Sequence, residues 1–175
     1  MEKRQAIFAC IGPESTGKTT LSEQLAVALN GSLVPEFSRT FLEERGGMYE
    51  QKDLQTIAKG QLALEESIIS KGIMPIICDT DVLVIMVWHE FKYGERSDVL
   101  EELFRQQKPR KYLLAYPDLP WQYDALRENP NDLHAIFEHF VKTLKRLGAE
   151  YTIVDGIGSS RLQNALNAIK RMKFG

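Results

Sequence analysis

The sequence has too little cysteine, too short apolar runs and too small a charge imbalance for several classes of protein. Cys10 and Cys78 are its two cysteines, which excludes a disulfide framework and leaves too few thiolates for a cysteine-built zinc site. No apolar run approaches the ~20 residues of a membrane-spanning helix, and the first residues contain no signal-peptide core. The 22 basic and 24 acidic residues give a formal net charge of −2, which argues against binding to nucleic acid or to an anionic membrane surface. We therefore expect a cytoplasmic protein with no nucleic-acid or membrane partner, and the sequence indicates no oligomeric state.

The composition that remains is typical of a globular protein, with 43% hydrophobic and 26% charged residues over 175 positions. Short apolar runs predict strands, and they alternate with stretches of helical periodicity. This alternation is typical of βαβ units around a parallel sheet, so we expect a single three-layer α/β domain over residues 1–175. The predicted strands are 6–11, 33–35, 73–78, 111–116 and 151–154, and the predicted helices are 18–29, 52–71, 82–91, 133–147 and 159–172.

Residues 117–130 interrupt the alternation, because they contain three prolines between a predicted strand and a predicted helix. Connections of this length are usually functional lids or disordered segments. The aromatic residues of this segment disfavour disorder, so we predict a lid over a ligand.

Residues 12–19, Gly-Pro-Glu-Ser-Thr-Gly-Lys-Thr, match the P-loop pattern G-x-x-x-x-G-K-[ST] without deviation. The glycines allow the tight turn that aims successive N–H groups at phosphate oxygens, and the helix that follows adds its positive N-terminal end. Lys18 is expected to reach the β- and γ-phosphates, and the hydroxyl of Thr19 to ligate Mg²⁺. The sequence therefore predicts a nucleotide-phosphate site made by Gly12, Glu14, Ser15, Thr16, Gly17, Lys18, Thr19 and Thr20.

Acidic residues directly follow the strand predicted at 73–78. Ligands of parallel sheets bind beyond the carboxyl ends of the strands, where P-loop enzymes place the carboxylate that orients Mg²⁺ or its water. Asp79 occupies this position and is expected to be catalytic and to bind the metal. Asp81 either contacts the substrate or caps the helix predicted at 82–91, and the pattern leaves both interpretations open.

Polar residues also follow the short strand predicted at 33–35. Glu36 is placed to accept the proton of an attacking hydroxyl, and Arg39 to hold a phosphate or substrate oxygen; the alternative is a solvated ion pair. Gln61 lies on the otherwise apolar face of the helix predicted at 52–71, where a buried amide needs a partner. That partner is either a bound substrate or the backbone, and the pattern does not decide between them.

Three side chains of the 117–130 segment are candidate ligands of the substrate or of the transferred group. Arg127 is placed to close over a phosphoryl group, where a cation offsets developing charge. Trp121 and Asp124 are expected to contact the substrate, and the alternative for the whole set is a solvated turn. Trp88 differs, because it lies in an almost wholly apolar helix and is predicted to belong to the core.

Taken together, these motifs resemble one family. Gly-Pro-Glu-Ser-Thr-Gly-Lys-Thr-Thr-Leu, Pro-Glu-Phe-Ser-Arg, Ile-Ala-Lys-Gly-Gln, Cys-Asp-Thr-Asp and Asp-Leu-Pro-Trp-Gln-Tyr-Asp-Ala-Leu-Arg-Glu are similar to segments of the ribosylnicotinamide kinase domain. This domain lies at the C-terminus of bacterial NadR proteins and has stand-alone relatives, and the resemblance extends over residues 6–161. It implies a P-loop nucleoside-kinase-like fold, ATP and Mg²⁺ as cofactors, and a role in NAD biosynthesis. The implied reaction is phosphoryl transfer from ATP to the 5′-hydroxyl of nicotinamide riboside.

The resemblance also assigns parts of the site. It implies that residues 12–20 hold ATP, that the 154–156 turn holds adenine through its backbone, and that Glu36, Arg39 and residues 121–127 face the substrate. Leu133 departs from the family pattern, because family members often carry a second lid arginine near this position. The nucleotidyltransferase domain of NadR has no counterpart here, so we expect neither adenylylation nor DNA binding.

The leading hypothesis is thus a small-molecule kinase in which Glu36, in preference to Asp79, accepts the proton of the attacking hydroxyl. A nucleoside or nucleotide kinase of other specificity is the first alternative. A P-loop ATPase module that acts with a protein partner is the second.

Overall fold

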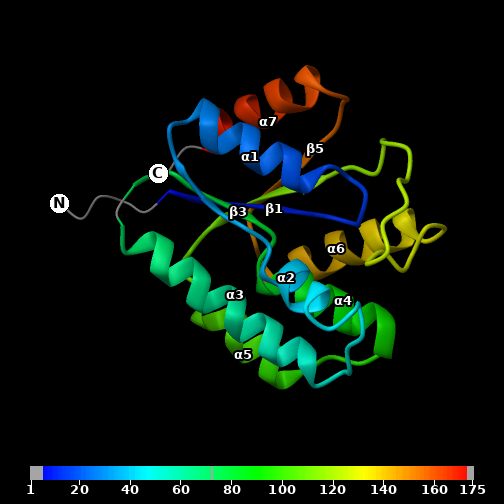
Figure 1. Ribbon diagram of the computed structural model, residues 1–175. Coiled ribbons are helices and arrows are strands. Elements are labelled where there is room, and N and C mark those ends of the chain that lie inside the picture. Colours follow the sequence, from blue (N-terminus) through cyan, green and yellow to red (C-terminus); the bar gives the residue numbers. More distant parts are fainter. Residues whose placement is uncertain (1–5, 72, 173–175) are drawn as a thin grey trace.

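The computed structural model describes residues 6–71 and 73–172, and its centre is one sheet of five parallel strands (Figure 1). The strand order is β2-β3-β1-β4-β5, which confirms the predicted parallel α/β architecture. The strands are β1 (Ile7–Ile11), β2 (Ser32–Val34), β3 (Ile76–Asp79), β4 (Lys111–Ala115) and β5 (Tyr151–Val154).

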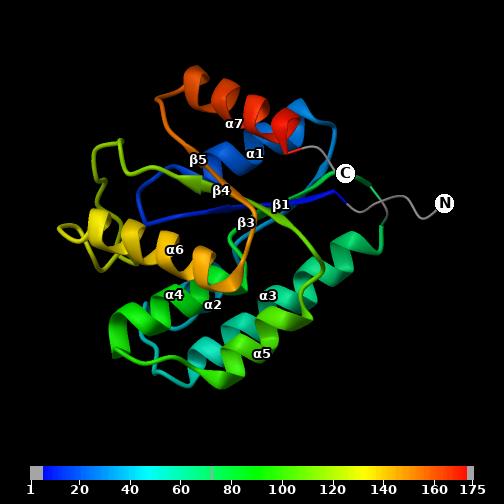
Figure 2. The same ribbon diagram turned by 180° about the vertical axis from the view of Figure 1, so that it is seen from behind.

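Helices cover both faces of this sheet and make the three layers that the sequence predicts (Figures 1 and 2). α1 (Lys18–Ala28) and α7 (Ser159–Arg171) pack on one face. The other face carries α2 (Phe37–Glu43), α3 (Asp53–Ile69), α4 (Val82–Tyr93), α5 (Asp98–Gln106) and α6 (Leu133–Leu147). None of the helices in the described ranges is long and apolar enough to cross a membrane.

The central strands divide their side chains between two cores, because consecutive residues of a strand point to opposite faces. Phe8 and Cys10 of β1 pack in the core below α1 and α7. Ile7, Ala9 and Ile11 pack in the core against α3, α4 and α6. Each fully buried large apolar side chain contributes about 1.5–3 kcal/mol to the stability of the fold. The two cores therefore keep the sheet in place and hold the carboxyl ends of its strands in fixed relative positions.

The observed elements differ from the predicted ones in a few places. β3 begins at Ile76 rather than at residue 73, since Pro75 has no N–H to donate to a neighbouring strand. The sequence analysis predicted neither the short α2 nor α5, although Ser97 caps α5 by accepting a hydrogen bond from the N–H of Leu100 at 3.3 Å. Gly72, which the pattern predicts to end the helix before β3, lies outside the described residues.

Candidate functional site

A cleft of about 890 Å³ opens beyond the carboxyl ends of the strands, at the upper end of the range of small-molecule sites. One wall is polar and consists of the turn between β1 and α1 together with the end of β2. The opposite wall is apolar and belongs to α4 and α6. Its side chains are Val84, Val87, Trp88, Phe91, Ile136 and Phe140.

The polar wall is the P-loop predicted from the sequence. Gly12 has a φ of +138°, and a Cβ at this position would lie 2.8 Å from the carbonyl oxygen of Ala115, so no larger residue fits. The hydroxyl of Thr16 donates to the carbonyl of Pro13 at 2.7 Å and tightens the turn. α1 begins at Lys18, so its first N–H groups have no partner within the helix and are available to an anion. The predicted residues that line the cleft are Gly12, Glu14, Ser15, Gly17, Lys18, Thr19 and Thr20, whereas Thr16 is buried below it.

Thr19, which lines the cleft at its P-loop end, is hydrogen-bonded to Asp79, which does not itself line the cleft. Thr19 Oγ1 donates to Asp79 Oδ2 at 2.7 Å, and Lys18 Nζ donates to the carbonyl of Pro13 at 2.6 Å. Asp79 is 3% exposed, and its Oδ1 has no hydrogen-bond partner within the described part of the chain. A hydroxyl and a carboxylate oxygen are ligands that Mg²⁺ accepts, so the pair fits a cation that is shared with phosphate oxygens. Residues 6–71 and 73–172 contain no group of three His, Cys, Asp or Glu that could hold a metal by itself.

Burial shifts the ionisation of this end of the cleft. It raises the pKa of Asp79 from 3.8 to about 6, while the hydrogen bond from Thr19 and the charge of Lys18 act against the rise. Burial lowers the pKa of Lys18, and the negative charges of Glu36, Asp79 and Glu14 oppose that change. Perturbed pKa values of this kind are common where charges have been brought together for catalysis.

Glu36 lies at the start of α2 and Arg39 lies within it, and both residues line the cleft. Glu36 accepts a hydrogen bond from the hydroxyl of Ser38 at 2.5 Å. Arg39 Nη2 lies 2.9 Å from Asp124 Oδ2, so α2 is joined to the 117–130 segment. Asp124 is engaged in this pair and does not line the cleft, and the N–H of Leu126 and the charge of Arg39 lower its pKa.

The 117–130 segment contains no helix or strand, and it is hydrogen-bonded to the P-loop. The carboxylate of Glu14 accepts from the two backbone N–H groups of residues 128–129. Ser15 Oγ accepts from a backbone N–H of the segment at 2.7 Å, and Arg127 Nη1 lies 3.4 Å from the same oxygen. Arg127 therefore lies beside the loop that contains Lys18.

Gln61 and Asp81, both candidate substrate ligands in the sequence, are bonded to the protein itself. Gln61 is 1% exposed, accepts from the N–H of Phe37 at 2.9 Å and donates to the carbonyl of Pro35 at 3.2 Å. Asp81 is fully buried and caps α4 by accepting from the N–H of Leu83 at 3.0 Å. Neither side chain lines the cleft, so of the two interpretations left open for each residue, the structural one describes them.

The two tryptophans differ in their relation to the cleft. Trp88 packs against the core, as predicted, but it also lines the cleft, and its Nε1 donates to the hydroxyl of Tyr49 at 2.8 Å. The apolar face of α4 extends beyond the core into the cleft, which a periodicity pattern does not reveal. Trp121 does not line the cleft, and its buried Nε1 has no partner in the described residues.

Arg161 is a residue of the site that the sequence analysis did not single out. It is 4% exposed, and its guanidinium donates to the carbonyl oxygens of Thr16 at 2.8 Å, Gly156 at 2.7 Å and Tyr116 at 3.1 Å. It also forms an ion pair with Asp118. One side chain thus joins the P-loop, the end of β4 and the turn before α7. The sequence feature that could have identified it is an arginine at the start of the otherwise apolar stripe of α7.

Comparisons with known proteins identify a family model and several solved structures that this chain is similar to. A family model described as an AAA domain matches residues 7–161, and no curated protein sequence matches the chain. A NadR protein in complex with NR has a TM-score of 0.79 and 18% identity, over 95% of this chain and 50% of that chain. A NadR protein in complex with NAD and AMP-PNP has a TM-score of 0.76 and 20% identity, over 95% and 49%. Thymidylate kinase from Ehrlichia chaffeensis has a TM-score of 0.73 and 16% identity, over 97% and 99%.

This chain thus spans about half the length of the NadR chains that it matches. At identities of 16–20% the likeness establishes the fold, which is that of P-loop nucleoside and nucleotide kinases.

Proposed function

The chain belongs to the AAA-domain family, and from that premise we propose that it is an ATP-dependent kinase which phosphorylates the 5′-hydroxyl of nicotinamide riboside. The observation that carries the proposal is the pairing of a P-loop with a buried strand-end carboxylate, Thr19 with Asp79, at one end of a cleft that has an apolar far wall. Such a cleft has room for a triphosphate and for a second small molecule. The choice of nicotinamide riboside rests on the motifs that resemble the NadR kinase domain and on the fold that the chain shares with NadR.

The residues of the P-loop suit Mg·ATP. Thr19 Oγ1 and Asp79 would hold Mg²⁺, because Asp79 Oδ1 is a buried carboxylate oxygen without a protein partner in the described residues. Bound there, Mg²⁺ supplies positive charge that offsets the charge of the phosphate oxygens. Ile157, which is 65% exposed and lines the cleft on the side of Arg161, offers an apolar surface to the base of the nucleotide.

Each polar side chain of the cleft then has a separate role. Lys18 exchanges the Pro13 carbonyl for phosphate oxygens and offsets their charge. Glu36 accepts the proton of the attacking hydroxyl, because it lines the cleft while Asp79 is bonded to Thr19. Arg127 acts on the transferring group from the 117–130 segment, which serves as the lid and excludes water.

The proposal is tested by a panel of acceptors incubated with Mg·ATP, in which ADP formation is measured and each product is identified by mass. Nicotinamide riboside should accelerate ADP formation and give its 5′-monophosphate, whereas Lys18→Ala should abolish the acceleration. If no member of the panel accelerates ADP formation, the kinase function is wrong.

A nucleoside monophosphate is the second candidate acceptor, and two cations in the cleft favour it. Arg39 and Lys92 both line the cleft, and we assign them to the part that would bind the acceptor. An anionic phosphate of the acceptor would pair with them. Thymidylate kinase from Ehrlichia chaffeensis also shares the fold over 99% of its chain. Thymidine, cytidine and their monophosphates therefore belong in the same panel, and a preference for one of them assigns the cleft to this second reaction.

A further inference from the structure

Thr80, between Asp79 at the end of β3 and Asp81, has three features that packing does not explain. Its φ of +78° is a backbone conformation that β-branched residues rarely adopt. Its side chain is 2% exposed, and its Oγ1 has no hydrogen-bond partner in the part of the chain that the structure describes. It also lines the cleft. Backbone strain and an unpaired buried hydroxyl at the same cleft residue are typical of a ligand-binding position.

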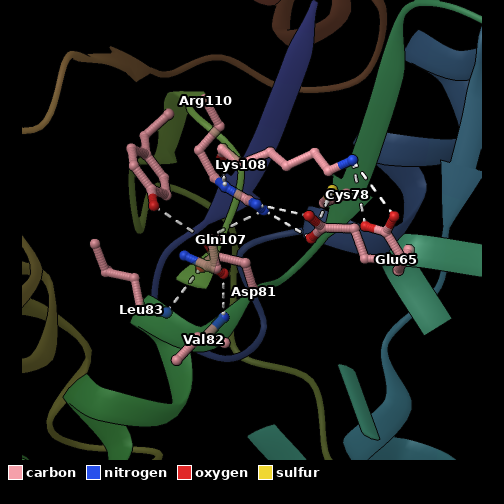
Figure 3. Close-up of polar contacts among 10 residues, drawn as sticks. Glu65, Cys78, Asp81, Val82, Leu83, Gln107, Lys108 and Arg110 are labelled. Carbon is pink, nitrogen blue, oxygen red and sulfur yellow. Dashed lines mark hydrogen bonds and ion pairs between the residues drawn. The ribbon is translucent and has the colours of Figure 1, made fainter. Parts of the chain in front are cut away.

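Asp81, the residue after Thr80, belongs to a buried ionic network (Figure 3). Asp81 accepts from the N–H of Leu83 at 3.0 Å and lies 3.8 Å from the guanidinium of Arg110. Arg110 in turn makes two bonds, of 2.7 and 2.6 Å, to the carboxylate of Glu65 on α3. Because all three charged side chains are at most 4% exposed, the network is shielded from solvent and fixes the residue after Thr80.

The backbone N–H of Thr80 is also engaged, since it donates to the carbonyl of Cys10 on β1 at 3.1 Å. The turn is therefore held both by the neighbouring strand and by the network at Asp81. A strained residue persists only where its surroundings determine its conformation in this way. Thr80, which lines the cleft, is thus held by a turn that is rigid before any ligand binds, and its buried Oγ1 keeps a free hydrogen-bonding capacity within the described residues.

The charges around Thr80 indicate which chemistry it would bind. Asp79 precedes it with an unpartnered carboxylate oxygen, and the charge of Glu36 acts on Asp79 from the end of β2. Without a cation between them, two carboxylates disfavour an anionic phosphate oxygen at this point, whereas a neutral hydroxyl suits it with or without the cation. A threonine hydroxyl both donates and accepts, so it can pair with a ligand hydroxyl in either direction. Val84 and Val87 of α4 line the same cleft and suit the apolar part of the same ligand.

We infer that Thr80 binds the phosphate acceptor, through a hydrogen bond between its Oγ1 and a hydroxyl group of the nucleoside. This inference rests on the proposed kinase function and adds a residue that discriminates for hydroxyl-bearing acceptors. It assigns Thr80 to the binding of the acceptor and not to the binding of ATP.

Three variants separate the hydroxyl from the turn. Thr80→Val removes the hydroxyl and keeps the branched shape, whereas Thr80→Ser keeps the hydroxyl and is the matched control. Thr80→Gly removes the hydroxyl and also relieves the positive φ, so it should fold at least as readily as Thr80→Val. The readouts are KM for nicotinamide riboside, KM for ATP and kcat, with calorimetric binding of nicotinamide riboside as a measurement that needs no turnover.

Thr80→Val and Thr80→Gly should each lower kcat/KM for the acceptor and weaken its binding about tenfold, with KM for ATP within twofold of wild type. Thr80→Ser should stay within threefold of wild type. The inference is overturned if Thr80→Gly folds and keeps wild-type acceptor binding, if Thr80→Ser loses as much as Thr80→Val, or if the loss lies in KM for ATP. Failure of the wild-type protein to bind or phosphorylate any acceptor would instead refute the proposed function.

Discussion

Asp79 carries its charge at a position where burial opposes ionisation. The pKa of about 6 means that the folded protein holds a proton on this group more tightly than the unfolded chain, whose value is 3.8. The contribution of Asp79 to the free energy of unfolding is therefore present at low pH, falls as the pH rises through the window from about 4 to 6, and stays lost above it. At neutral pH the carboxylate costs stability in the absence of a bound cation, which is the expected behaviour of a group kept for function.

Asp79→Asn should accordingly stabilise the ligand-free protein while it removes activity. The amide has no charge to bury and can still accept from Thr19, so we expect a gain of about 1–3 kcal/mol at pH 8 that vanishes near pH 4. The turnover number should fall by about 10²-fold or more, because under the proposed function the site loses the carboxylate that would orient the metal. Thermal unfolding at both pH values and steady-state kinetics check this. Glu138→Gln, at an exposed carboxylate of α6, is the matched control, and a less stable Asp79→Asn protein at pH 8 would contradict the account.

The same ionisation sets the pH dependence of catalysis. Protonated Asp79 cannot serve as a cation ligand, so kcat/KM for Mg·ATP should fall below about pH 6, approaching tenfold per unit. The measurement is a pH–rate profile from pH 5 to 8 at saturating acceptor. A profile that stays flat down to pH 5 would show that this carboxylate is not required in its ionised form.

At the scale of elements, the central point is how the 117–130 segment is held. It is tied to the P-loop through Glu14 and Ser15 and to α2 through the pair between Arg39 and Asp124. Glu128 adds a third tie, because it pairs with Lys92 of α4 at 3.2 Å. These contacts join the segment to the P-loop, to α2 and to α4.

Arg127→Ala should lower kcat tenfold or more, about 1.4 kcal/mol in the activation free energy, with little change in thermal stability. The reason is that its guanidinium lies beside Ser15 of the P-loop, where under the proposed function it would offset charge that develops during transfer. Arg127→Lys keeps a charge and should recover part of the rate. An unchanged kcat in Arg127→Ala would remove this residue from the mechanism.

Arg161→Met should raise KM for ATP about tenfold more than KM for the acceptor. The substitution keeps an apolar stem and releases the carbonyl of Thr16, which the guanidinium holds beneath the P-loop. Initial rates with each substrate varied in turn measure the two constants. Equal effects on both constants would mean that Arg161 supports the fold in general and not the nucleotide end of the cleft.

Local sequence patterns predict well those features that are themselves local. The apolar run of β1, the stripe of α6 and the P-loop motif each lie within about a dozen residues, and the structure has β1, α6 and the P-loop turn at these positions. Ambiguity remained where the partner lies far away in the chain. Asp81 has the same sequence signature as a cap and as a ligand, and only its contact with Arg110 and its full burial decide between them. Arg161 and Thr16 are 145 positions apart, and no periodicity relates them.

At the scale of the whole molecule, the two sides of the sheet have different kinds of interior. The core below α1 and α7 is apolar, whereas the side of α3 contains the ion pair between Glu65 and Arg110 at 4% and 2% side-chain exposure. Burial lowers the pKa of Arg110, but the hydrogen bonds to Glu65 and the charges of Asp81 and Glu65 outweigh it and raise that pKa above its usual value. Removing one partner of such a buried pair strongly lowers the stability of a protein, whereas replacing both partners with apolar residues costs little stability.

Arg110→Met should therefore lower the free energy of unfolding by about 3–5 kcal/mol, because it leaves two buried carboxylates, Glu65 and Asp81, without their cation. The double variant with Glu65→Met should recover at least half of that loss, since one of the two stranded charges is removed as well. Denaturant unfolding measures both variants. A double variant that is no more stable than Arg110→Met would show that the pair is not the source of the cost.

The central claim is that this cleft passes the terminal phosphoryl group of ATP to a hydroxyl of a small molecule and not to water. The most direct measurement is the amount of ADP formed per phosphorylated nucleoside when the protein is incubated with Mg·ATP and nicotinamide riboside. The account predicts one ADP per 5′-monophosphate, with ADP formation about 10²-fold slower or more when the nucleoside is omitted. ADP formation at the same rate with and without a nucleoside, or none under either condition, would contradict it.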